Sequence, residues 1–145
     1  MHHYRRLAFM AVLSFAAMYA LMYAMVDSWS NVYGNLNQAY MAGLMTAPMV
    51  GLELLLMRGM YRDRRRNAVI LAASLVGGLL CLAAIRNQSA IGDRQFLRSM
   101  IPHHAAALLM CQEAPLADPA IKDLCGRILS SQRAEIAEME ALLRR

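Results

Sequence analysis

Two adjacent histidines, His103 and His104, are the residues in this sequence best suited to chemistry. Met100 precedes them by about one helical turn, and Met110 and Cys111 follow about two turns later. Imidazole nitrogen together with thioether or thiolate sulfur is a ligand mixture that suits copper and, less specifically, zinc. This segment therefore predicts a metal site, with copper favoured over zinc.

A second segment near the C-terminus carries donors that are expected to face the histidines. Here apolar residues with helical spacing form a seam that includes Met139. Gln132 and Glu135 interrupt this seam near its middle. We expect the metal ligands to be His103, His104, Met100, Met139 and Glu135, with Met110 and Gln132 as supporting or alternative groups. The alternative is a buried hydrogen-bond network in which histidine meets Gln and Glu, because buried polar groups need partners.

These donors are expected on the two helices of an antiparallel hairpin. The first helix runs from Asp93, a plausible N-cap, to about residue 113; the second begins with Asp118 as N-cap and Pro119 as first helical residue. Folding the chain about residues 115–116 places His103 and His104 level with Ile128, and Met100 level with Gln132. The same folding offsets Cys111 from Cys125 along the axis, which makes a disulfide between them doubtful. Pro102 should kink the first helix and expose the carbonyl of Arg98.

The hairpin also resembles a known family. The string Phe96-Leu97-x-x-Met100-Ile101-Pro102-His103-His104, followed by Met110 and by Ile128-x-x-x-Gln132-x-x-Glu135-Ile136-x-x-Met139, is similar to the domain of unknown function 305. The resemblance covers residues 93–143 and implies a ferritin-like helical fold and, for some extracytoplasmic members, copper binding and tolerance. Other members often carry a doubled unit of four helices. Because one hairpin makes a thin core, we expect a homodimer or higher homo-oligomer to complete a bundle.

The rest of the chain is apolar enough to lie in a membrane. Of the 145 residues, 59% are hydrophobic, and three runs are long enough to cross a bilayer. These runs cover residues 7–26, 39–57 and 68–85. We therefore predict an all-α protein with a three-helix transmembrane region, residues 1–86, and an extracytoplasmic helical hairpin, residues 87–145.

Charge gives the expected orientation. Residues 27–38 contain no Lys or Arg, whereas residues 58–67 contain five arginines. By the positive-inside rule the N-terminus and the second loop are cytoplasmic, so the hairpin lies outside, in the periplasm or extracellular space of a bacterium whose inner membrane holds the spans. Because most of these arginines flank apolar runs and do not alternate with aromatic residues, the net charge of +5 does not indicate a nucleic-acid partner.

Two other functions fit parts of the sequence. Methionines recur along the first two spans, at Met18, Met22, Met25, Met41, Met45 and Met49, and thioethers select Cu(I). They suggest a Cu(I) conduit, and one Met-x-x-x-Met weakly resembles the high-affinity copper transporter family; packing filler is the alternative. The third possibility is a metal-free accessory subunit. With no activated nucleophile, nucleotide loop or paired acid and base, an enzyme is not expected. Glu53 is either a functional intramembrane carboxylate or a partner of Arg58.

Overall fold

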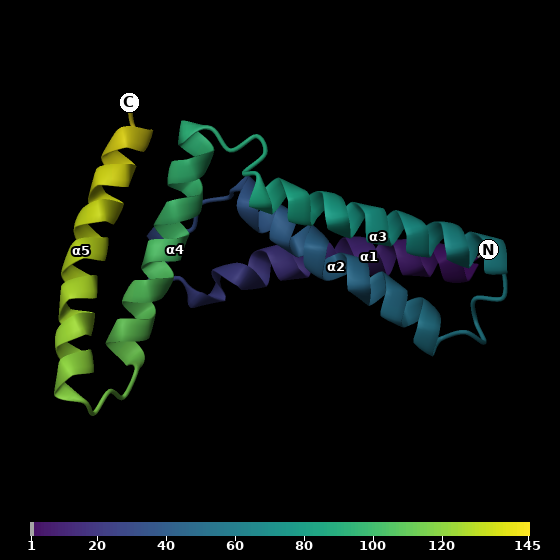
Figure 1. The fold of residues 1–145 in the computed structure, drawn as a ribbon, viewed down its shortest axis with the longest axis horizontal. Coiled ribbons are helices and arrows are strands. Elements are labelled where there is room, and N and C mark those ends of the chain that lie inside the picture. Colours follow the sequence, from purple (N-terminus) through teal and green to yellow (C-terminus); the bar gives the residue numbers. More distant parts are fainter. Residues whose placement is uncertain (1) are drawn as a thin grey trace. The chain divides into compact units, whose positions relative to one another are not determined.

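The structure is a computed structural model, and it describes residues 2–145 (Figure 1). Over these residues the chain is all-α, with two short 3-10 helices and no strand, as the sequence predicts. The helices are α1 His2–Leu21, α2 Leu36–Leu56, α3 Arg64–Arg86, α4 Asp93–Glu113 and α5 Pro119–Leu143. The 3-10 helices, Met22–Met25 and Trp29–Asn31, lie between α1 and α2.

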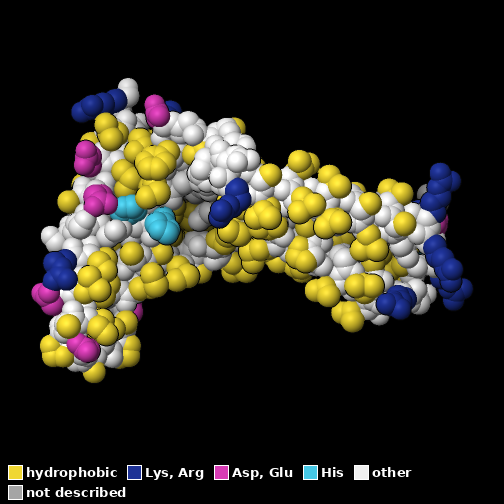
Figure 2. Space-filling model, in the orientation of Figure 1, with side chains coloured by type: hydrophobic (Ala, Val, Ile, Leu, Met, Phe, Trp, Pro, Cys, Tyr) yellow, Lys and Arg dark blue, Asp and Glu magenta, His cyan; other side chains and the backbone are white. Residues whose placement is uncertain are grey.

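Helices α1, α2 and α3 form one compact unit, made of residues 2–22 and 37–89. Each is long and apolar enough to cross a membrane; with its 3-10 extension the first span reaches Met25. The unit has a small core of Leu7, Val50, Leu54 and Tyr61. Most of its other large apolar side chains face outward and cover its surface (Figure 2). Such a surface is stable in lipid and not in water, so the three helices indicate a membrane protein.

Small residues bring α2 and α3 close together. A Cβ added at Gly78 would lie 3.0 Å from the Cβ of Ala47, and one at Gly43 would lie 2.8 Å from the sulfur of Cys81. Close backbone approach through Gly and Ala is the usual way in which membrane helices pack. Cys81 therefore serves packing. Pro48 is accommodated without ending α2.

The connection between α2 and α3 is tied down by polar contacts. The Tyr61 hydroxyl donates to Glu53 at 3.3 Å, so Glu53 meets this tyrosine and not Arg58 as the sequence suggested. Asp63 caps α3 by accepting from the backbone N–H of Arg66, with which it also forms an ion pair at 3.0 Å. Both acidic groups at this end of the unit are thus engaged.

The second compact unit contains the α4–α5 hairpin and, in addition, residues 23–36 from the connection between α1 and α2. Its buried core consists of Ile101, Ala105, Leu108, Ile136 and Met139. Val26 and Tyr33 of the connection pack against this core. The sequence-based boundary after residue 86 does not assign residues 23–36 to the hairpin, although they complete its packing.

Pro102 explains one of these contacts. A proline inside a helix cannot donate to the carbonyl four residues earlier, which here is the carbonyl of Arg98. The side-chain amide of Asn35 donates to that oxygen at 3.4 Å, and the backbone N–H of Leu36 donates to Gln95 at 3.1 Å. The connection thus supplies the hydrogen bond that the proline removes, and α4 continues through Pro102 without a break.

The hairpin register differs from the expected one. Cys111 and Cys125 form a disulfide with a Cα–Cα distance of 5.4 Å, so our doubt about this bridge was wrong. Asp118 and Pro119 start α5 as predicted, but Gly92 and not Asp93 occupies the N-cap position of α4. The helices are shifted by between one and two turns relative to a fold about residues 115–116, since that fold would place Cys111 level with residue 120 and not with Cys125.

Candidate metal centre

His104 is held at the interface between α4 and α5. The residue is 7% exposed, and its Nδ1 lies 3.0 Å from the carbonyl oxygen of Met100, one turn earlier in α4. Its Nε2 lies 2.7 Å from a carboxylate oxygen of Glu135 on α5. A carbonyl oxygen only accepts, so Nδ1 carries a proton and Nε2 is the nitrogen presented to α5.

Glu135 is the partner of this histidine and remains half exposed. Its second carboxylate oxygen accepts from the Ser131 hydroxyl at 2.6 Å. The hydrogen bonds from Ser131 and then from His104 lower the pKa of the Glu135 carboxyl. The ionised carboxylate and Nε2 of His104 lie within hydrogen-bonding distance, at 2.7 Å. A metal ion bound by Nε2 would take the place of this hydrogen bond.

Gln132 is a further candidate oxygen donor on α5. It precedes Glu135 by one turn on α5, and its side-chain oxygen Oε1 is buried with no hydrogen-bond partner among residues 2–145. A buried acceptor without a partner is costly unless a ligand, ion or water satisfies it. The two helices therefore supply three candidate donor groups for a metal ion, namely His104 Nε2, the Glu135 carboxylate and Gln132 Oε1.

The three candidate thioether ligands of the hairpin differ in burial. Met139 is 8% exposed and belongs to the hairpin core, and Met100 packs against the same core. Met110, by contrast, is 52% exposed. Met100 and Met139 are thus part of the packed interior of the hairpin, whereas Met110 faces outward from it.

The two histidines have different surroundings. His103 is exposed while His104 is buried, and their ring centroids lie 6.1 Å apart. Within residues 2–145 no group of three His, Cys, Asp or Glu side chains comes close enough to hold a metal ion. The hairpin brings together His104 and Glu135 from the expected set, places Gln132 one turn along, and leaves His103 and Met110 facing outward. Sequence reasoning missed Ser131, whose position four residues before Glu135 was the available signal.

The methionines of the membrane-length helices do not share one surface. Met18 is half-buried, with its sulfur 3.9 Å from the Thr46 hydroxyl, whereas Met41 and Met45 are 40% and 43% exposed. These outward-facing thioethers do not line a path inside the three-helix unit. Packing against lipid or another subunit accounts for them as simply as a Cu(I) conduit does.

Comparison with known proteins gives two matches. Residues 79–143 match the family described as "Domain of unknown function (DUF305)". An uncharacterized protein of Acanthamoeba polyphaga mimivirus is 33% identical over 140 residues, which covers 92% of this chain and 88% of the relative. No solved structure matches.

Proposed function

Because this chain belongs to the DUF305 family, we propose that it is a membrane-anchored copper-binding protein whose α4–α5 hairpin holds the metal. Its role would be copper tolerance, storage or delivery, and not catalysis. The observation that carries the proposal is the pairing of His104 Nε2 with the Glu135 carboxylate at 2.7 Å. The unpartnered oxygen of Gln132, one turn earlier on α5, is a further candidate donor.

The donor set fits copper in two oxidation states. The hydrogen bond from His104 Nδ1 to the Met100 carbonyl orients the ring with Nε2 toward α5, as outer-shell partners of metal-binding histidines usually do. Nitrogen and carboxylate donors suit Cu(II), and the thioethers of Met100 and Met139 would add affinity for Cu(I). Zinc accepts the nitrogen and oxygen donors but gains little from thioethers.

Exposed groups suggest that a second copy takes part. His103 and Met110 face outward from α4, and Phe96, Met110, Ile121, Leu124 and Leu142 are large apolar side chains that the hairpin leaves exposed. Two helices with five buried core residues bury little surface, and a homodimer would cover these side chains in a four-helix bundle. His103 of one copy would then be available to the site of its partner.

The topology follows from charge and from packing. Arginines gather at the end of the three-helix unit that holds the N-terminus and the α2–α3 connection (Figure 2). The positive-inside rule makes that end cytoplasmic in a bacterial inner membrane. Residues 23–36 pack against α4, which requires both segments to lie on one side of the membrane. The Cys111–Cys125 disulfide supports an oxidising compartment such as the periplasm for that side.

Copper titration of the full chain in detergent tests the proposal. A His2→Gln/His3→Gln background removes the second histidine pair of the sequence, which would otherwise bind copper at the N-terminus. In this background we expect stoichiometric Cu(I) or Cu(II) binding and a copper-dependent rise in the unfolding temperature. His104→Gln with Glu135→Gln should abolish both. Binding that survives in this variant, with the disulfide and helix content unchanged, would rule out the assigned site.

A metal-free accessory role is the second candidate, and one observation favours it. Both ring nitrogens of His104 already have oxygen partners, so the histidine is satisfied as a core hydrogen-bonding group. In that case the titration would give no stoichiometric copper and no gain in unfolding temperature. The His104 and Glu135 variants would then lower stability equally with and without copper.

A further inference from the structure

Charge is distributed unevenly between the two compact units. Residues 2–22 and 37–89 contain eight arginines and two acidic residues, whereas residues 23–36 and 90–145 contain seven basic and eight acidic residues. The excess positive charge of the protein therefore belongs to the three-helix unit. Both acidic groups of that unit are engaged, Glu53 by Tyr61 and Asp63 by Arg66.

Three of these arginines line one cavity between α2 and α3. Arg58, Arg62 and Arg64 surround a space of about 480 Å³ whose apolar wall is formed by Leu54, Leu55 and Leu71. None of the three forms an ion pair with another described side chain, and all three are exposed. Guanidinium groups bind phosphate through paired N–H donors, so this cavity is suited to an anionic phosphate group.

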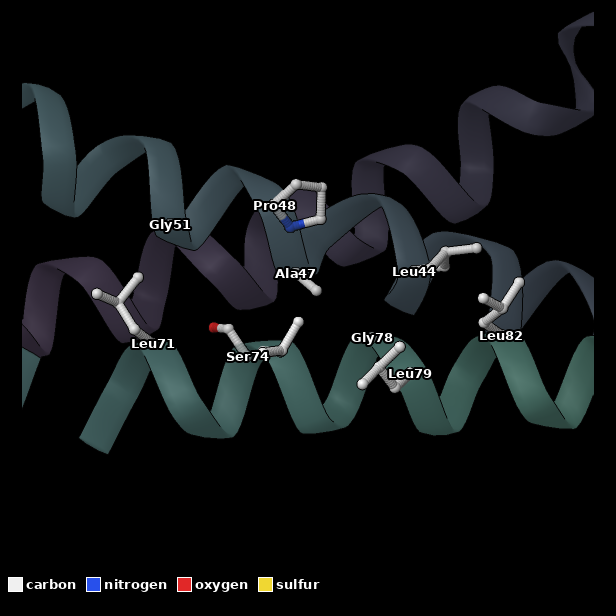
Figure 3. A pocket seen from close by; sticks show the side chains of 10 residues that line it. Leu44, Ala47, Pro48, Gly51, Leu71, Ser74, Gly78, Leu79 and Leu82 are labelled. Atoms are coloured by element: carbon white, nitrogen blue, oxygen red, sulfur yellow. The ribbon is translucent and has the colours of Figure 1, made fainter. Parts of the chain in front are cut away.

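A second cavity continues between the same two helices toward the middle of the spans. It has a volume of about 390 Å³, and Leu71 lines both cavities. Leu44, Pro48 and Gly51 of α2 face Ser74 and Gly78 of α3 across it, and Ser74 supplies the one polar side chain of the lining (Figure 3). Both volumes are in the range of ligand sites in proteins.

The C-terminal half of α2 diverges from α3 (Figure 1). Pro48 removes one backbone hydrogen bond of the helix, and beyond it the C-terminal half of α2 runs away from α3 (Figure 1). On the other side of Pro48, Gly78 and Ala47 hold the helices in close contact. The two helices therefore lie closest at Gly78 and Ala47 and separate toward the arginine-lined end.

We propose that the two cavities, together called the cleft, bind one anionic phospholipid, with its phosphate between Arg58, Arg62 and Arg64 and an acyl chain along Gly51 and Ser74. A free anion would use the arginines but not the apolar groove, and a neutral lipid would use the groove but not the charge. A basic pocket between membrane helices is a known setting for anionic headgroups. The two neighbouring cavities, which share Leu71, fit a molecule that has both parts. The proposal does not depend on copper binding.

The test uses full-length protein in mild detergent with added phosphatidylglycerol, phosphatidylcholine or inorganic phosphate. Native mass spectrometry reports retained lipid, and thermal unfolding reports stabilisation. We expect one phosphatidylglycerol per chain and a higher unfolding temperature, with no such effect from phosphatidylcholine or phosphate. Equal stabilisation by phosphatidylcholine would overturn the proposal, and stabilisation by phosphate equal to that by phosphatidylglycerol would reduce the site to a simple anion site.

Matched variants test the two halves of the site. Arg58→Gln/Arg62→Gln/Arg64→Gln should weaken phosphatidylglycerol binding at least tenfold, whereas Arg5→Gln/Arg6→Gln/Arg65→Gln removes equal charge outside the cleft and should change it less than twofold. Equal loss in both triple variants would show general surface attraction and refute a defined site.

The groove has its own pair of variants. A Cβ at Gly51 would lie 3.6 Å from Leu71, so Gly51→Leu fills the groove and should prevent lipid retention. A Cβ at Gly77 has no neighbour within 4 Å, so Gly77→Leu should leave lipid retention unchanged. Retention by a folded Gly51→Leu variant would show that no acyl chain occupies the cleft.

Discussion

The Cys111–Cys125 disulfide should provide much of the stability of the hairpin. The two cysteines are separated by 14 positions, so the bridge closes a loop of about 15 residues. Constraining a loop of about this length in the unfolded chain contributes about 3 kcal/mol in the chain-entropy treatment. The buried core of this unit has only five residues, two of them on α5. Cys111→Ser/Cys125→Ser should therefore loosen α4 and α5 strongly.

Amide hydrogen exchange of the full chain in detergent measures this effect. Since about 1.4 kcal/mol corresponds to a factor of ten, α4 and α5 amides should exchange roughly 100-fold faster in the double variant. Helices α1 to α3 serve as an internal reference, and Cys81→Ala controls for the loss of a cysteine away from the bridge. If the α4 and α5 amides exchange at the wild-type rate without the bridge, the reasoning about loop entropy and the thin core is refuted.

Two further predictions concern polar contacts of the hairpin unit. Asn35→Ala should lower the free energy of unfolding by about 1 kcal/mol. In a Pro102→Ala background the loss should be much smaller, because the backbone N–H of residue 102 can again donate to the Arg98 carbonyl. Equal losses in both backgrounds would mean that the Asn35 side chain does not replace the hydrogen bond that Pro102 removes. Ser131 and His104 lower the pKa of Glu135, so this carboxylate should stabilise the fold at pH above its ordinary pKa of 4.5 and lose that contribution as the pH falls through its lowered pKa. Thermal unfolding from pH 7 to 3 should show wild-type and Glu135→Gln midpoints converging at acid pH; a constant difference would contradict this.

The membrane-length helices were predictable because length and apolar content determine them. The predicted spans, residues 7–26, 39–57 and 68–85, lie within the observed helices apart from one or two residues at their ends. In a span the backbone must satisfy its own hydrogen bonds, so a long apolar run has few alternatives to a helix. The start of α5 at Asp118 and Pro119 was predictable for a similar reason, since both residues act locally.

The register of the hairpin was not predictable from local patterns. The faces of α4 and α5 follow from periodicity, and Glu135 contacts His104 as expected. How far one helix slides along the other depends on the conformation of the connection and on the disulfide, and neither leaves a periodic signal in the sequence. The expected register placed His104 opposite Ile128, whereas its partner is Glu135, almost two turns further along α5.

The packing of residues 23–36 against α4 was also missed, because no periodic pattern marks it. From the sequence, Asn35 is an ordinary polar loop residue. Only the structure shows that its side chain donates to the Arg98 carbonyl that Pro102 leaves without a donor. Long-range contacts of single residues leave little trace in one sequence.

The contact between residues 23–36 and α4 also constrains how the protein is made. The connection is synthesised about 60 residues before α4, so Val26, Tyr33 and Asn35 have no partner on α4 when they leave the ribosome. If the three helices cross the membrane, the hairpin unit reaches its final packing only after the third crossing delivers α4 to the same side. Insertion of the third helix is then the step on which folding of the hairpin depends, although no residue of that helix belongs to the hairpin core.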